Sequence, residues 1–342
     1  MNKSLISWAL YDVSNTVFNL GVVGLFLPLY INSRQGTTDA DLGYPLAISM
    51  AIVLVASPLI GALTDQLKGR IRIFTVLNVL ATVATCLIGL GSNLYVSLGV
   101  FSIAFIAVYL AELLYNAMLA DASTPKNRGA VGGISIAVGY LGSLAVVLLV
   151  LQYEEMSSNH GFILQILGVI FFVTAAPMTL FFKEVYNRPE SNQLGPTNVS
   201  LFGSTLTQIK STRTHFKQNP QLLSFFVARY FYMVAVTTGS TFAVMYGMNT
   251  IGFSEREVEL VLLLGTLVAI PSAMLWGYVV DKSGPGNALK WDLLGWALIL
   301  AGSVSIPWFH LTPQLWWPLS IFTGLIFAGL WVADRPLLIQ LS

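Results

Sequence analysis

Charged residues are scarce in this sequence: Asp, Glu, Lys and Arg make up 10% of it, whereas a soluble globular domain carries about 25%. Hydrophobic residues make up 55%, and the mean hydropathy is +0.73. So little charge cannot cover the surface of a water-soluble protein of 342 residues. The composition therefore predicts an integral membrane protein whose surroundings are the lipid bilayer.

Cysteine and histidine are equally rare. The single cysteine, Cys86, lies in an apolar run and excludes an intramolecular disulfide. The histidines, His160, His215 and His310, are too far apart in the sequence to predict a metal site of the Cys/His type. We therefore expect no metal and no other cofactor.

Other functional classes are excluded by what is missing. The net charge of +1 offers no basic stripe, so we expect no nucleic-acid partner. The sequence has no catalytic triad and lacks the glycine-rich loop with lysine and serine that binds ATP phosphates. These absences argue against an enzyme and against an ATP-driven pump.

Long apolar runs are what the sequence does contain. About 20 apolar residues make one membrane crossing. By this criterion the chain holds ten candidate helices, at residues 5–31, 43–64, 72–92, 94–120, 129–151, 161–182, 221–247, 257–280, 289–308 and 314–334. The predicted fold class is an all-α membrane protein.

Basic residues indicate the orientation of these spans. With a cytoplasmic amino terminus, only Arg34 and Arg256 of the 17 Lys and Arg residues fall outside, and Arg229 lies within a span. Cytoplasmic loops of membrane proteins are enriched in Lys and Arg. The bias therefore supports both the set of spans and the orientation.

A polar segment after the sixth span divides the chain. We predict an amino-terminal half of six helices (residues 1–182), a cytoplasmic linker (183–219) with a short amphipathic helix over 201–216, and a carboxyl-terminal half of four helices (220–342). The linker follows from its polar composition and its two prolines. These breaks predict two helical bundles.

A weak internal repeat supports the two halves. Gly61 and Asp65 follow the second span, and Gly277 and Asp281 follow the eighth, each glycine four residues before the acid. Parallel repeats of this kind are typical of transporters with two related halves. By this repeat the second half lacks two helices, so we expect a fragment; the alternative is an unusual protein of ten spans.

An acid interrupts the first apolar run. At 100° per residue, Asp12 shares one helix face with Asn15, Thr16 and Asn19. An ionisable side chain at membrane depth costs roughly 2.5 to 3.5 kcal/mol and is retained mainly where it meets a cavity, a partner or a substrate path. Two interpretations stay open: this face contacts a substrate or a coupling proton, or Asp12 only hydrogen-bonds a neighbouring helix.

The fourth span has a second polar face, made of Tyr109, Glu112 and Asn116. A carboxylate in a low-dielectric cavity can exchange protons near neutral pH, as proton-coupled transport requires. Glu112 is therefore a second candidate for proton coupling, and the same structural alternative applies to it.

The seventh and ninth spans carry further charges. Arg229 lies roughly 12 Å into its span at 1.5 Å per residue. It either meets Asp12, Glu112 or an anionic substrate group, or extends to the cytoplasmic interface. Asp292 is close to Lys290 and is predicted to lie at the membrane interface.

The fifth span carries a row of small residues, Gly132, Ser135, Gly139, Gly142 and Ser143. Small residues let helix backbones approach closely in a membrane. The row predicts packing against a helix of the other half.

The connection between the second and third spans is short and charged, with Gly61, Asp65, Gly69 and Arg70. An acid at the end of one helix can accept hydrogen bonds from basic side chains or from a neighbouring helix amino terminus. We predict that these residues form a conformational latch, with Asp281 as the counterpart in the second half. The alternative is an ordinary helix cap in a cytoplasmic turn.

The run G-x-x-x-D-x-x-x-G-R after the second span, with six spans and a polar linker, resembles the major facilitator superfamily. The resemblance implies a bundle of two pseudo-repeated halves, in which the first and fourth helices of each half line a central cavity. It also places Asp65 and Arg70 at the family's latch positions, whereas the second copy of the run lacks the arginine cluster.

The amino-terminal SWALYDVSN resembles one branch of that superfamily, typified by the autophagy-related vacuolar amino-acid effluxers and their prokaryotic relatives. The branch commonly has Y-D-W-A-N, of which this sequence keeps Tyr11, Asp12 and Asn15. It departs from the branch in the seventh span, where Met233 and Val234 stand at the place of a frequent second acid.

The resemblance implies a secondary active transporter that moves a small solute by alternating access. Amino acids are the substrate class of the best-known relatives, and a proton or another ion is an option for coupling. The location implied is a prokaryotic plasma membrane. The alternative is a membrane receptor or scaffold that has the same fold and transports nothing.

Overall fold

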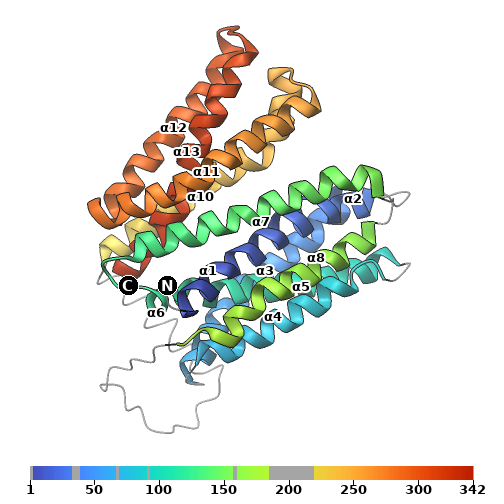
Figure 1. Ribbon diagram of the computed structural model, residues 1–342, viewed down its shortest axis with the longest axis vertical. Coiled ribbons are helices and arrows are strands. Elements are labelled where there is room, and N and C mark those ends of the chain that lie inside the picture. Colours follow the sequence, from blue (N-terminus) through green and yellow to red (C-terminus); the bar gives the residue numbers. More distant parts are fainter. Residues whose placement is uncertain are drawn as a thin grey trace. The chain divides into compact units, whose positions relative to one another are not determined.

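The computed structural model describes residues 3–32, 39–66, 69–90, 93–156, 160–184 and 219–341. Within these ranges the chain forms helices and no strand, in agreement with the predicted all-α class (Figure 1). The elements are α1 (Lys3–Thr16), η1 (Val17–Phe26), α2 (Leu27–Asn32), α3 (Asp39–Gln66), α4 (Arg70–Leu87), α5 (Leu94–Ala117), α6 (Leu119–Ala122), α7 (Arg128–Met156), α8 (His160–Phe181), α10 (Pro220–Tyr246), η2 (Gly247–Ile251), α11 (Glu255–Ser283), α12 (Pro285–Trp308), η3 (Pro313–Leu315) and α13 (Trp316–Leu341).

Nine helices among the described residues are long and apolar enough to cross a membrane. The predicted first span is present as a continuous helical run, 3–32, in which the π-helix η1 separates α1 from α2. A π-helix has wider turns than an α-helix and is frequent at functional sites. The ten predicted spans therefore correspond to nine uninterrupted helices and this composite one.

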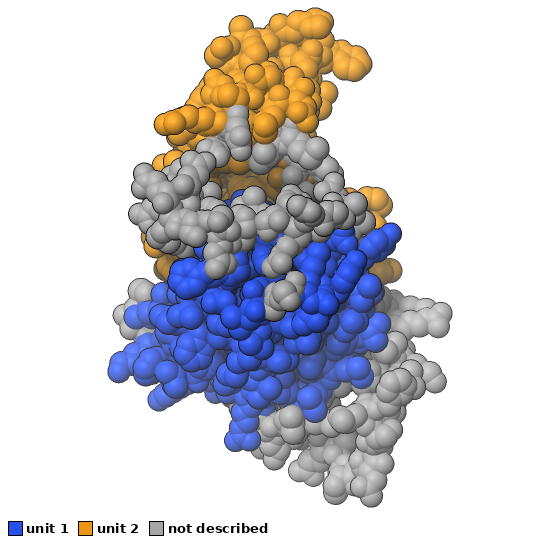
Figure 2. Space-filling model, turned by 90° about the vertical axis from the view of Figure 1, so that its right-hand side faces the viewer, with its two compact units in different colours: residues 1–122, 145–214 blue, residues 123–144, 215–342 orange. Residues whose placement is uncertain are grey.

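The chain separates into two compact units, coloured in Figure 2. Unit 1 comprises residues 1–122 and 145–214, and unit 2 comprises residues 123–144 and 215–342. The boundary falls inside α7, whose first part belongs to unit 2.

The predicted linker lies almost entirely outside the described residues. Only Lys183, Glu184 and Asn219 of the segment 183–219 are described. The amphipathic helix predicted over 201–216 also falls outside.

Aromatic stacking and a hydrogen bond fix α1 within unit 1. Trp8 stacks on Tyr115 of α5 with ring centroids 4.6 Å apart, and Tyr11 packs on the same ring at 4.8 Å. The hydroxyls of Ser14 and Thr174 share a hydrogen bond of 2.7 Å between α1 and α8. These contacts hold the first predicted polar face inside the unit.

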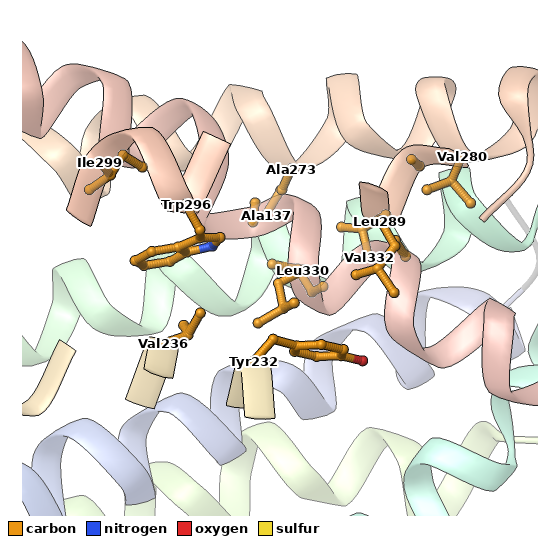
Figure 3. Close-up of a cluster of buried hydrophobic side chains, with 14 of the residues drawn as sticks. Ala137, Tyr232, Val236, Ala273, Val280, Leu289, Trp296, Ile299, Leu330 and Val332 are labelled. Carbon is orange, nitrogen blue, oxygen red and sulfur yellow. The ribbon is translucent and has the colours of Figure 1, made fainter. Parts of the chain in front are cut away.

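The core of unit 2 is made by buried side chains from five helices, α7, α10, α11, α12 and α13 (Figure 3). Tyr232 and Val236 come from α10, and Trp296 and Ile299 come from α12. Dense packing of this kind tolerates little change in side-chain volume.

Glycine lets α7 and α11 approach closely within unit 2. A Cβ on Gly133 would overlap the carbonyl oxygen of Ala273, and a Cβ on Gly277 would lie 2.8 Å from the carbonyl oxygen of Gly129. Such contacts let backbones pack where lipid offers no hydrophobic driving force. Close packing of the fifth span on a helix of the second half thus occurs at Gly129 and Gly133, whereas a Cβ on Gly132 would have nothing within 4 Å.

Gly133→Ala is expected to destabilise the protein by about 1–3 kcal/mol, because the added methyl group overpacks the contact with α11. Gly132→Ala is the matched control and is expected to be neutral, or stabilising by up to about 1 kcal/mol through helix propensity. Thermal unfolding in detergent compares the two variants. Equal effects would contradict the close approach of α7 and α11.

Candidate functional site

The two predicted polar faces meet inside unit 1. Asp12 and Asn15 on α1 are buried, with 5% and 6% of their surface exposed, and Asn19 follows in η1. The hydroxyl of Tyr109 on α5 donates a hydrogen bond of 3.0 Å to Oδ1 of Asn19. The first and fourth spans are therefore joined through polar side chains that the sequence had singled out.

Both predicted acids act on one tyrosine. Glu112 on α5 lies close enough to Tyr11 and Tyr109 for an electrostatic interaction with both hydroxyl groups. Asp12 interacts in the same way with Tyr11. Asp12 is buried, whereas Glu112 is partly exposed. The two carboxyl groups thus share one electrostatic neighbourhood.

Both polar faces carry amide atoms that lack hydrogen-bond partners. The side-chain oxygen and nitrogen of Asn15 are buried and make no hydrogen bond, and the same holds for Oδ1 of Asn116. A polar group without a partner is costly in a membrane interior, so unsatisfied amides there are available to a polar ligand or to water. We refer to the six residues on these two faces as the unit 1 polar cluster: Asp12, Asn15, Asn19, Tyr109, Glu112 and Asn116.

Carboxyl, amide and hydroxyl groups are therefore the chemistry that the cluster offers. Across the ranges that the structure describes, no three His, Cys, Asp or Glu residues are grouped as a metal site would require. The groups present can hydrogen-bond a polar solute and exchange protons.

Helix α4 begins in a charged group of side chains. Glu184 accepts hydrogen bonds from the backbone amides of Arg70 (2.9 Å) and Ile71 (3.3 Å), where the helix carries partial positive charge. The guanidinium of Arg70 pairs with Asp121 at 3.5 Å. Burial raises the pKa of the Asp121 carboxyl, Arg70 opposes this rise, and the charge of Glu184 adds to it. The side chain of Asp65 lies outside the described part of the structure.

Asp281 binds the first turn of α7. Its two carboxylate oxygens accept hydrogen bonds from the backbone amides of Gly129 (2.7 Å) and Ala130 (2.9 Å). The first amides of a helix have no partner within the helix, so a carboxylate there both satisfies them and offsets the helix dipole. Asp281 caps α7 in unit 2 as Glu184 caps α4 in unit 1.

Arg229 pairs with an acid that the sequence analysis had not proposed as its partner. Its Nε lies 3.0 and 2.9 Å from the two carboxylate oxygens of Asp334 on α13, and its Nη2 lies 2.9 Å from Oδ2. Tyr232 donates a hydrogen bond to the same carboxylate. The Asp334 side chain is 4% exposed and that of Arg229 is 36% exposed. The ion pair lies entirely within unit 2.

The prediction that Asp292 lies at the membrane interface is wrong. Its side chain is fully buried, with 0% exposed, whereas Lys290 is exposed. Two residues apart on a helix, side chains point about 200° away from each other. Proximity to Lys290 in the sequence therefore gave no information about the surroundings of Asp292.

Comparisons with known sequences place these features in a family context. Residues 14–341 match the family model of the Major Facilitator Superfamily. The chain is 24% identical over 292 residues to an uncharacterized MFS-type transporter, YxiO, of Bacillus subtilis (strain 168). The aligned region covers 81% of this chain and 67% of that protein. It is 28% identical over 177 residues to an uncharacterized protein of Aquifex aeolicus (strain VF5). This aligned region covers 51% of this chain and 44% of that protein.

Solved structures show the same fold. The proton:xylose symporter XylE, bound to 6-bromo-6-deoxy-D-glucose, matches 99% of this chain and 80% of its own, with a TM-score of 0.64 and 15% identity. The human organic anion transporter MFSD10 (TETRAN) matches 98% of this chain and 84% of its own, with a TM-score of 0.68 and 16% identity. At these identities the likeness concerns the fold alone.

Arg229→Gln is expected to destabilise the protein more than Asp334→Asn. Without Arg229, the buried carboxylate of Asp334 has no cation, and an uncompensated buried charge costs about 3–5 kcal/mol. Without Asp334, the partly exposed guanidinium can extend to water or lipid headgroups. Because Arg229 is 36% exposed, we expect a loss at the lower end of that range, measured by thermal unfolding in detergent.

The double variant Arg229→Gln/Asp334→Asn provides the control for this prediction. A neutral amide at position 334 removes the unpaired charge, so the double variant should be more stable than Arg229→Gln alone. A double variant that is no more stable would show that Arg229→Gln fails for another reason, such as lost packing.

Proposed function

The chain belongs to the Major Facilitator Superfamily, and we propose that it moves a small polar solute bound by the unit 1 polar cluster. The protein is a multi-pass integral membrane protein that carries out secondary active transport. What it transports is the subject of the proposal.

The unsatisfied amides carry the proposal. The Asn15 amide and Oδ1 of Asn116 are buried without partners, and the amide group of Asn15 offers both a donor and an acceptor. The carboxyl groups of Asp12 and Glu112 favour a positively charged group nearby. A solute with a cationic amine and polar acceptors fits this set, and an amino acid has both. The resemblance of the Tyr11 to Asn15 run to the vacuolar amino-acid effluxers supports the same class.

Proton coupling is the second part of the proposal. A carboxyl group that is buried in one state and hydrated in another binds its proton with different affinity in the two states. Asp12 and Glu112 are the candidates in unit 1. The solved symporter of xylose and protons has the same fold, which is compatible with coupling of this kind.

Location and organisation are proposed on separate grounds. The distribution of Lys and Arg favours a cytoplasmic amino terminus. A bacterial relative favours a prokaryotic plasma membrane. The repeat of Gly61 and Asp65 at Gly277 and Asp281 favours two pseudo-repeated halves, 1–182 and 220–342, joined by the linker.

Asp12→Asn is expected to abolish proton-linked transport and to leave folding largely intact, since the amide keeps the shape of the carboxyl but cannot ionise. A thermal-shift screen of the purified protein with amino acids, sugars and nucleosides identifies a ligand, because a ligand that binds the folded state raises its stability. Uptake of that ligand into proteoliposomes is then measured with and without an imposed pH gradient.

The outcomes of this experiment separate the two parts of the proposal. Unchanged transport with unchanged dependence on the gradient in Asp12→Asn would exclude Asp12 as the coupling group. If no amino acid stabilises the protein but a sugar or nucleoside does, the proposed substrate class is wrong. Asn15→Ala, which removes an unsatisfied amide, is expected to weaken the thermal shift of the true ligand.

We also propose a conformational latch. It comprises Gly61, Asp65, Gly69 and Arg70 between α3 and α4, and Asp281 at the end of α11. Supporting the proposal, Asp281 is exposed although it binds two amides of α7. Water can therefore replace its hydrogen bonds when α7 and α11 separate, so the contact can open and close at low cost.

Asp281→Ala is expected to favour separation of α7 from α11. Loss of a capping acid costs about 0.5–2 kcal/mol, and a change of about 1 kcal/mol raises an open population roughly fivefold. Ala137 of α7 lies four residues after Gly133, on the same helix face, packs in one buried cluster with Ala273 of α11 and is 6% exposed. Ala137→Cys in a Cys86→Ser background therefore reports opening through its rate of thiol labelling. Lys282→Ala, at the next residue, is the control, and equal labelling rates in the two variants would rule out the latch at Asp281.

A further inference from the structure

Asp292 is a carboxyl group buried in the interior of unit 2. It lies seven residues after the start of α12 at Pro285, about 10 Å along the helix axis at 1.5 Å per residue. Its side chain has no exposed surface. Neither the unit 1 polar cluster nor the latch uses this group.

No cation compensates Asp292 in the described part of the chain. Both of its carboxyl oxygens are buried without a hydrogen-bond partner, although the backbone amide of Leu330 lies nearby on α13. Among the described residues, the charged side chains of the helices that pack on α12 make no ion pair with Asp292. They include Arg229, Asp281, Lys282, Asp334 and Arg335. Arg229 and Asp334 neutralise each other, Asp281 binds α7, and Lys282 lies 5.6 Å from the ring centroid of Tyr278.

The surroundings of Asp292 are apolar and tightly packed. Across from it, a Cβ added to Gly329 of α13 would overlap both the carboxyl oxygen of Asp292 and the ring of Trp276. The indole N–H of Trp276 is not available, because it donates to the carbonyl oxygen of Leu325 at 2.8 Å. One turn along α12, the buried N–H of Trp296 also lacks a partner.

The tight packing around Asp292 limits which ligand its carboxyl group can bind. A metal ion or a solute needs several oxygen ligands and a cavity, whereas the contact at Gly329 leaves the carboxyl no such space. A proton needs no cavity and removes the charge that burial makes unfavourable. An uncompensated carboxylate at this depth in a membrane protein is unfavourable for the same reason.

We infer that Asp292 is a proton-binding site of unit 2, neutral in the packed arrangement of α12 and α13 and able to release its proton when water enters between these helices. Protonation then favours the packed arrangement. The sign follows from linkage: the packed state binds the proton that the hydrated state releases, so a rise in pH weakens the packed state. Assigning this proton to the transport cycle rests on the proposed function, whereas the protonation itself does not.

Infrared difference spectroscopy of the full chain in lipid tests the protonation without any substrate. A protonated carboxyl group has a C=O stretching band that an ionised carboxylate lacks. The wild-type protein at neutral pH is expected to show such a band, and Asp292→Asn is expected to lose it. Asp41→Asn is the matched control, because Asp41 on α3 is partly exposed, so this variant should keep the band.

A second readout keeps the inference testable if other carboxyl groups contribute to the spectrum. The thermal stability of the wild type is expected to fall as the pH is raised from acid to neutral, relative to that of Asp292→Asn, whose amide does not titrate. Parallel pH profiles of the two proteins, together with identical carbonyl bands, would overturn the inference. Absence of solute transport would leave both readouts unchanged, so failure of the proposed function is distinguishable from failure of this one.

Discussion

Each acid inside a membrane bundle must be paired, bound to backbone amides or neutral, because lipid supplies no water to solvate a charge. Asp334 is paired with Arg229. At helix ends with access to solvent, Asp281 and Glu184 accept hydrogen bonds from the first amides of a helix. Asp292 has neither solution, which leaves the neutral form. The way in which each carboxyl group is stabilised therefore determines how readily its contacts break when water or a proton becomes available.

The contacts at helix ends differ from those in the helix interior in how they can be broken. The first amides of α4 and α7 are satisfied by Glu184 and Asp281, and both carboxylates retain some access to solvent. Water can take over such hydrogen bonds when the helices move. The carboxylate of Asp334 is 4% exposed, so breaking its ion pair would leave a buried charge. We therefore expect the Arg229–Asp334 ion pair to stay intact within unit 2. The capping contacts of Glu184 and Asp281 can break at lower cost when helices move.

The sequence allowed the helices and the polar faces to be predicted, because apolar runs and the 100° periodicity are local properties. The hydrogen bond between Asn19 and Tyr109 joins two faces defined in that way. The partner of Arg229 could not be predicted, since Asp334 follows it by 105 residues and only tertiary packing brings them together. Asp292 was misplaced because a neighbouring lysine in the sequence says nothing about the opposite face of a helix. The boundary between the units, which lies inside α7, could not be predicted for a similar reason. Hydropathy does not specify which neighbours a helix packs against.

Two of the unsatisfied polar sites differ in kind, and this difference bears on coupling. In the unit 1 polar cluster, the amide of Asn15 and Oδ1 of Asn116 lack partners; these amides stay neutral at any physiological pH, so only a ligand or water can satisfy them. In unit 2 the carboxyl of Asp292 also lacks a partner, and its unfavourable burial is relieved by a proton. If the unit 1 polar cluster binds the solute and Asp292 binds a proton, unit 1 responds to solute and unit 2 responds to pH. Secondary active transport requires that two such responses bias the same conformational equilibrium, because a ligand shifts an equilibrium only by its differential affinity for the two states.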